Sequence, residues 1–151
     1  LQGLAETSFG FINCIARPEI PDWADLAKPI EQHISCGYVD PARITAGDVF
    51  CGEDRECLDG EEFIVRAQAL DSHNACGFDF YSKPENWKYL PKDVDVLVFP
   101  KTVFRHRRGV RCVRYLYRGG SEWGRNYCRL GGGFARDCRL ALLASPQPSS
   151  T

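Results

Sequence analysis

Eight cysteines in a chain of 151 residues without methionine constrain the fold more than any other feature of this sequence. Their number is even, and they are spread along the chain at Cys14, Cys36, Cys51, Cys57, Cys76, Cys112, Cys128 and Cys138. No two of them have the C-x₂-C spacing that is typical of structural zinc sites and thiol redox motifs. We therefore predict four disulfides, whose connectivity the sequence leaves open, and no metal site.

Disulfides at this density are typical of oxidising compartments, so the cysteines predict a secreted, extracellular protein. No apolar run reaches the 18 or more residues of a membrane span. A length of 151 residues suits one domain. We expect a single disulfide-stabilised domain over residues 1–144, a monomer, followed by a disordered tail at 145–151 that is rich in proline and serine.

The spacing of apolar residues predicts mixed secondary structure. Trp23, Leu26, Ala27, Ile30 and Ile34 recur at helical intervals, which predicts a helix that starts at Asp22 or at Pro29 and stops near Cys36. Strands are expected at 6–15, 48–51, 62–70, 76–81, 94–104 with an interruption at Pro100, 110–118, 125–130 and 134–143. This order predicts an α+β fold, with an antiparallel sheet of four to six strands and one or two helices on a face.

The net charge of −1 conceals a strong asymmetry along the chain. Residues 1–100 carry 18 acidic and 8 basic side chains, whereas residues 101–151 carry 2 acidic and 11 basic ones. Ten of these eleven are arginine, which suits bidentate contacts with phosphate or carboxylate. Two interpretations stay open: a surface that binds an acidic or anionic partner, or internal pairing of the basic region with the acidic one.

The sequence offers little for catalysis. Its histidines are His33, His73 and His106, of which His73 is the best candidate for proton transfer. No nucleophile elbow, phosphate loop, HExxH or calcium-loop motif is present. We therefore predict no enzyme, no catalytic residue and no cofactor.

One short segment resembles the small fungal guanyl-specific ribonucleases. Gly77-Phe78-Asp79-Phe80 is similar to the stretch that follows their catalytic glutamate. Here Cys76 precedes the glycine, so that glutamate is missing, and the last 45 residues contain no histidine. This resemblance implies a ribonuclease-like domain without the chemistry.

A second resemblance involves Val113-Arg114-Tyr115-Leu116-Tyr117-Arg118-Gly119. It is similar to the motif W-R-(F/L/V)-L-K-G of the Leptosphaeria avirulence-suppressing family, a group of small cysteine-rich effectors of fungal plant pathogens. The segment departs from the motif at Val113 and Tyr115, and by one extra residue before Arg118. The resemblance implies an antiparallel sheet with helices, several disulfides, and a host protein or immune receptor as partner. The alternative for the same segment is a core strand of the sheet.

We accordingly expect a secreted, non-enzymatic virulence or avirulence effector of a plant pathogen. It would act in the host apoplast, or enter host cells, and bind a host protein that serves in plant immunity. The expected partner-binding residues are basic with one aromatic anchor: Arg105, Arg107, Arg108, Arg118, Arg125 and Trp123. Two alternatives stay open. One is an RNA-binding or ribonuclease-like secreted protein, for which nucleic acid is the less favoured partner; the other is a hydrolase inhibitor or toxin that uses the loop between Cys51 and Cys57.

Overall fold

A six-stranded sheet forms the centre of the computed structural model, which describes residues 7, 8, 10–50, 54 and 56–145. The strand order is β5 (Ile44–Gly47), β11 (Arg139–Leu143), β7 (Val96–Arg105), β8 (Arg111–Gly119) and β9 (Glu122–Arg129), and β3 (Ile30–His33) also pairs with β7. All neighbours are antiparallel except β11 and β7, which run parallel.

Two small sheets flank the central one. The first contains β1 (Thr7–Ser8), β2 (Phe11–Asn13) and β4 (Tyr38–Val39). The second pairs β6 (Cys57–Asp59) with β10 (Gly133–Ala135). The remaining elements are the helices α1 (Gly60–Gln68) and α2 (Ala75–Tyr81) and the 3₁₀ turns η1 (Pro41–Arg43) and η2 (Pro84–Tyr89).

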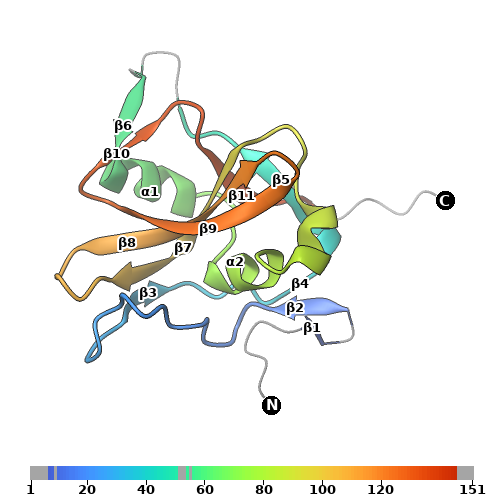
Figure 1. Cartoon of the computed structure of the whole chain (residues 1–151), viewed down its shortest axis with the longest axis horizontal. Helices are drawn as coiled ribbons and strands as arrows, with labels where there is room; N and C mark the ends of the chain where they lie inside the picture. The colour runs from blue at the N-terminus through green and yellow to red at the C-terminus, as the bar shows by residue number, and fades with distance from the viewer. Residues whose placement is uncertain (1–6, 9, 51–53, 55, 146–151) are drawn as a thin grey trace.

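The helices α1 and α2 cover opposite faces of the central sheet (Figure 1). Side chains alternate between the two faces of a strand. Leu97 and Phe99 of β7 accordingly enter the core cluster that contains α2, whereas Val98 enters the one that contains α1. Val103, which lies within the register shift of β7, also enters the cluster with α1. The predicted α+β class is confirmed. The expected antiparallel sheet of four to six strands is correct except for the parallel pair of β11 and β7. The expectation of helices on one face is wrong, because both faces are apolar and each receives a helix.

Two segments predicted as strands, 62–70 and 76–81, are instead helical. The Asp59 side chain caps α1 by accepting from the Glu62 N–H, and Arg66 binds Glu62 one turn earlier at 2.9 Å. The Asn74 side chain caps α2. Every residue of α2 is buried, so this helix has no polar face from which a helical period could be recognised.

The helix predicted between residues 22 and 36 does not form. Its second half is β3, and the Pro29 carbonyl accepts a hydrogen bond from the Arg105 N–H at 2.9 Å. Trp23 lies in a coil segment and stacks on Tyr127 with a centroid distance of 4.1 Å. The apolar spacing therefore does not mark one buried face: Trp23 contacts Phe104 of the sheet from a turn, whereas Leu26 is 98 % exposed. The strand expected at 48–51 does not form over residues 48–50, since β5 ends at Gly47, and residue 51 lies outside the described residues.

The sequence predicts the strands of the last third of the chain well. The strand expected at 110–118 is β8, and the turn after it uses Gly120, whose φ of 65° favours glycine. The two strand pieces separated by Pro100 form the continuous β7, whose pairing with β8 shifts register between Phe99 and Phe104. Such a bulge accommodates a proline within a sheet. The range 134–143 divides into β10 and β11.

The prediction of four disulfides is wrong for the described part of the chain. Cys51 lies outside the described residues, and the others are free thiols: Cys14, Cys36, Cys57, Cys76, Cys112, Cys128 and Cys138. Several of the sulfur atoms lie near backbone carbonyls: Cys76 Sγ lies 3.1 Å from the Ala16 oxygen, and Cys36 Sγ lies 3.5 Å from the Ser72 oxygen. Several of these thiols act as small apolar core residues.

Among the described residues no helix is long and apolar enough to cross a membrane. The predicted tail falls almost entirely on residues 146–151, which lie outside the described residues.

Candidate functional site

Much of the basic region pairs with carboxylates from the acidic first hundred residues. Ion pairs join Arg105 to Glu31, Arg111 to Glu31, Arg118 to Asp95 and Arg125 to Glu19, with N–O distances of 2.7, 3.1, 3.8 and 3.7 Å. These pairs are partly exposed, and such pairs stabilise a fold by about 1 kcal/mol or less each. Internal pairing is thus the correct interpretation for four of the arginines.

Three of the predicted partner-binding residues in this set, Arg105, Arg118 and Arg125, are therefore already engaged. Arg107 is exposed and donates to the Asp22 carbonyl at 2.9 Å. Trp123 is only 9 % exposed and belongs to the core, with the Arg118 guanidinium 5.6 Å from its ring. The structure therefore offers no exposed aromatic anchor at Trp123.

The remaining predicted residue, Arg108, lines a surface pocket of about 590 Å³ that we call the arginine pocket. It is formed by His106, Arg108, Val110, Asn126, Tyr127, Cys128 and Arg129. The first three come from the turn between β7 and β8, and the last four come from β9. Since β7 and β9 both pair with β8, the sheet brings these two segments together.

Aromatic stacking fixes one wall of the arginine pocket. Trp23 stacks on Tyr127 and also on His106, with centroid distances of 4.1 and 5.6 Å. His106 Nδ1 accepts from the Arg108 N–H at 3.1 Å, which leaves Nε2 as the ring donor toward the Tyr127 hydroxyl at 3.4 Å. These contacts hold the Tyr127 ring and the backbone of Arg108 in place before any ligand binds.

The arginine pocket is positively charged. Arg108 and Arg129 are both exposed, and neither guanidinium contacts a carboxylate among the described residues. Asn126 uses its Oδ1 to accept from the Tyr127 N–H, so its amide N–H groups remain available as donors. Two guanidinium groups beside an amide form a suitable site for a carboxylate or a phosphate.

A second group of charges, which no sequence pattern indicates, lies behind this pocket. Arg114 of β8 is only 7 % exposed, and its guanidinium lies 4.2 Å from the Phe78 ring centre and 5.6 Å from that of Trp23. Its Nε has no hydrogen-bond partner in the described structure. Burial lowers the pKa of Arg114 to about 10. This guanidinium is held mainly by aromatic faces from distant parts of the chain, so the residues of β8 alone cannot reveal its burial.

Asp79 lies close to Arg114 without forming an ion pair with it. It is 3 % exposed, and its Oδ2 accepts from the Glu19 N–H at 2.8 Å. Burial raises the pKa of Asp79 to about 7, although the hydrogen bond from Glu19 and the charges of Arg114 and Arg125 act in the opposite direction.

The best sequence candidate for catalysis, His73, is fully buried. Its Nδ1 lies 3.9 Å from Cys14 Sγ, and its Nε2 has no partner among the described residues. Burial lowers the pKa of His73 to about 3 and raises that of Cys14 far above its usual value. A neutral histidine beside a protonated thiol, both inaccessible to solvent, fills the core rather than activating a nucleophile.

His33 is also structural. Its Nδ1 lies 2.8 Å from Thr102 Oγ1 and its Nε2 lies 2.9 Å from the Ala16 oxygen, and burial lowers its pKa. No group of three or more His, Cys, Asp or Glu side chains in the described ranges is arranged to hold a metal ion.

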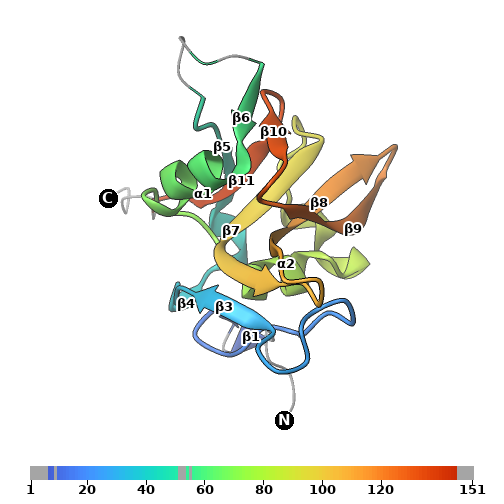
Figure 2. The same cartoon turned by 90° about the vertical axis from the view of Figure 1, so that its left-hand side faces the viewer.

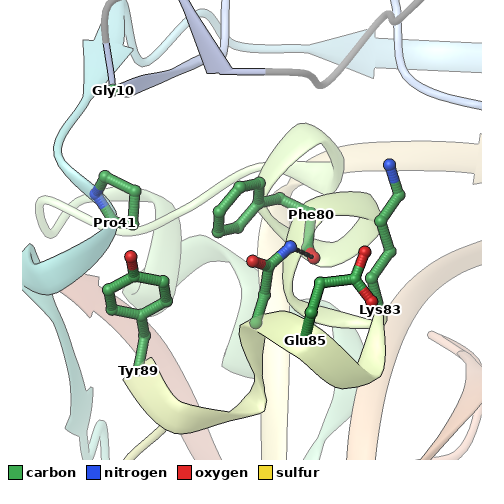
Figure 3. A pocket seen from close by; sticks show the side chains of 7 residues that line it. Gly10, Pro41, Phe80, Lys83, Glu85 and Tyr89 are labelled. Carbon is green, nitrogen blue, oxygen red and sulfur yellow. Dashed lines mark hydrogen bonds between the residues drawn. The ribbon is translucent and has the colours of Figure 1, made fainter.

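A second pocket, of about 480 Å³, lies between η2 and the turn at Gly10 (Figure 3). Phe80 and Tyr89 form its apolar part, while Lys83 and Glu85 lie on the other side. The amide of Asn86 is engaged with the Phe80 carbonyl at 2.8 Å. With one ammonium and one carboxylate, this pocket has no dominant charge, and none of the residues expected for partner binding lines it.

Comparison with protein-family models, with curated proteins and with solved structures finds no match for this chain. The resemblance to the effector family thus depends on the segment Val113–Gly119. That segment is part of β8, a strand between β7 and β9, with Val113 and Leu116 fully buried.

Proposed function

We propose that this chain is a non-enzymatic binding domain that holds an acidic segment of another protein in the arginine pocket. The observation that carries this proposal is the state of Arg108 and Arg129. Both are exposed, both line one pocket, and neither has a carboxylate partner among the described residues. Charge-assisted hydrogen bonds from guanidinium to carboxylate are among the stronger polar contacts available to a surface.

The architecture of the site supports binding rather than catalysis. His73 and His33 are engaged in the core, and the pKa values of the buried thiols Cys14 and Cys76 are raised by burial. Stacking on Trp23 fixes the Tyr127 ring of the arginine pocket, and a hydrogen bond to His106 holds the Arg108 backbone, before the ligand arrives; both lower the entropic cost of association.

A host protein is the partner that we propose, in line with the effector function expected from the sequence. The proposal of secretion into the apoplast loses part of its support, because it depends on disulfides and the described cysteines are thiols. Extracellular action therefore remains a prediction. The resemblance of residues 113–119 to the effector motif supports it, and the cysteines do not. The inhibitor alternative involves the loop at Cys51, which lies outside the described residues.

Nucleic acid fits the site less well. Base stacking requires a free aromatic face, and one face of Tyr127 is covered by Trp23. Tyr115 and Tyr117 lie on β8 at positions that alternate with Arg114, so they project from the opposite face of the sheet. Few stacking groups therefore accompany Arg108 and Arg129.

Fluorescence anisotropy with a labelled hexaglutamate peptide tests the proposal. We expect binding that weakens with salt, and a loss of about tenfold or more in the double variant Arg108→Gln/Arg129→Gln, since one lost charge-assisted contact is enough for that factor. The control variant Lys28→Gln/Lys83→Gln removes the same charge from exposed residues outside the pocket. Equal weakening in both variants, or a preference for a labelled uridine oligonucleotide over the peptide, would contradict the proposal.

A further inference from the structure

Strand β9 is an edge strand of the central sheet. It pairs with β8 from Glu122 to Arg129, and no other strand of the described residues pairs with it. Figure 2 shows β9 at the outer margin of the sheet. Edge strands expose a row of backbone donors and acceptors that can pair with another chain.

The hydrogen bonds to β8 define which backbone groups of β9 point outward. The Leu130 N–H donates to the Arg111 carbonyl at 2.9 Å. Hydrogen-bonded and non-hydrogen-bonded residue pairs alternate along an antiparallel ladder. The backbone N–H and C=O groups of residues 128, 126, 124 and 122 therefore also face β8. The outward groups then belong to Trp123, Arg125, Tyr127 and Arg129. The bond from the Tyr127 N–H to its neighbour's side chain, Asn126 Oδ1, agrees with this assignment.

The outward edge carries positive charge, and the bond from the Tyr127 N–H to Asn126 Oδ1, which an added strand would replace, occupies one of its donors. Natural edge strands avoid unwanted pairing through proline, bulges or charged side chains. The range Glu122–Arg129 contains no proline, and its pairing with β8 proceeds without a register shift. Arg125 and Arg129 lie on one face of the strand, four residues apart, and both are exposed. This edge therefore repels basic strands, a second copy of itself included, and complements acidic ones.

The arginine pocket lies along the same edge, because Asn126 to Arg129 form one side of it. We infer that β9 accepts an extended acidic segment of the partner protein as an added antiparallel strand, with a carboxylate of that segment in the arginine pocket. This inference depends on the proposed function and adds the conformation and charge pattern of the ligand. In strand addition the backbone ladder supplies affinity, and side chains at every second position supply specificity.

The register predicts a charge pattern in the partner. Directly opposed residues of an antiparallel pair lie on the same face of the sheet. Residues opposite Arg125 and Arg129 are four positions apart, so we expect carboxylates at positions i and i+4 of the added strand. The carboxylate opposite Arg129 binds a guanidinium without a carboxylate partner among the described residues, whereas the one opposite Arg125 competes with Glu19, which lies 3.7 Å from that guanidinium. The residue midway between them faces Tyr127, which favours an apolar or β-branched side chain there.

Backbone methylation of a synthetic peptide separates strand addition from simple charge attraction. The probe is a fluorescein-labelled peptide with the sequence Thr-Glu-Val-Thr-Val-Glu-Thr, which has glutamates four positions apart. N-methyl groups at its second, fourth and sixth residues remove the N–H groups that would face β9. N-methyl groups at its third, fifth and seventh residues affect only N–H groups that face solvent, and this peptide with the same number of methyl groups is the matched control.

We expect the analogue methylated on the β9 side to bind at least about tenfold more weakly than the unmodified peptide, since it loses three hydrogen bonds and each contributes a factor of about two to ten. The control analogue should bind within about threefold of the unmodified peptide, because it keeps every ladder bond. Equal affinity of the two analogues would overturn strand addition. If affinity still falls in Arg108→Gln/Arg129→Gln in that case, the proposed function survives without it. Absence of binding by both the heptapeptide and the hexaglutamate at low salt contradicts both proposals.

Discussion

The buried carboxyl of Asp79 makes the stability of this fold depend on pH. Burial raises its pKa from 3.8 to about 7. Between these two values the folded chain holds a proton that the unfolded chain releases, so the free energy of unfolding falls as the pH rises. This difference in pKa between the folded and unfolded chain changes the free energy of unfolding by roughly 4 kcal/mol at most over the pH interval between the two values. That is a large part of the roughly 5–15 kcal/mol typical of a domain.

The substitution Asp79→Asn should remove this dependence. Asparagine resembles the protonated carboxyl in shape, and its Oδ1 can still accept from the Glu19 N–H that now binds Asp79 at 2.8 Å. We expect the variant to match the parent near pH 4 and to exceed it by as much as roughly 4 kcal/mol near pH 8. Urea denaturation followed by tryptophan fluorescence at several pH values measures both curves, and Asp93→Asn, at an exposed carboxyl, is the matched control.

Parallel curves for the parent and Asp79→Asn would refute this reasoning. That result would mean that Asp79 is ionised throughout, with the charges of Arg114 and Arg125 outweighing the effect of burial. Arg114→Gln would then be expected to destabilise the fold increasingly as the pH rises.

Two further predictions concern the core. Gly77→Ala should destabilise the fold by about 2 kcal/mol or more, because an added Cβ would lie 2.3 Å from the fully buried ring of His73. This expectation opposes the usual preference of a helix for alanine. Urea denaturation measures the change, and a gain in stability would show that the His73 ring can move. Thiol titration of the unreduced, unfolded protein should detect at least the seven free cysteines, whereas in the native state the fully buried Cys14, Cys76 and Cys112 should react slowest. A count near zero after unfolding would mean that disulfides form in the protein as isolated.

The sequence predicts strands here better than helices, for a physical reason. β8 combines β-branched and aromatic residues with a glycine turn, so local propensity and tertiary structure agree. In α2 the apolar residues surround the helix completely, and no periodicity distinguishes it from a buried strand. Around Trp23 the apolar spacing predicts a helix that does not form. Trp23 lies in a turn and contacts Tyr127 and Phe104, while Leu26 of the same pattern is exposed.

The cysteines show the limit of an inference from composition. An even number without metal spacing is consistent with bridges, but pairing requires sulfur atoms that approach each other. Here Cys14, Cys76 and Cys112 are fully buried among apolar side chains, where a thiol is a compact and nearly apolar group. Core packing thus accounts for these three cysteines, whereas Cys57 is exposed and Cys36, Cys128 and Cys138 are half-buried. The compartment must be determined by other means.

Charge counting locates the basic region but not the free charge within it. The sequence places Arg105, Arg108 and Arg125 together as candidates, yet only pairing in the fold shows that Arg108 lacks a carboxylate partner among the described residues. Arg129 is not among the expected partner-binding residues, because nothing in the sequence indicates that β9 would place it beside the turn that carries Arg108. The acidic half of the chain neutralises several of the other arginines, and this neutralisation makes the arginine pocket distinct. A surface with every arginine free would attract any polyanion, whereas two guanidinium groups beside an unpaired strand edge favour a ligand with sparse carboxylates and an extended backbone.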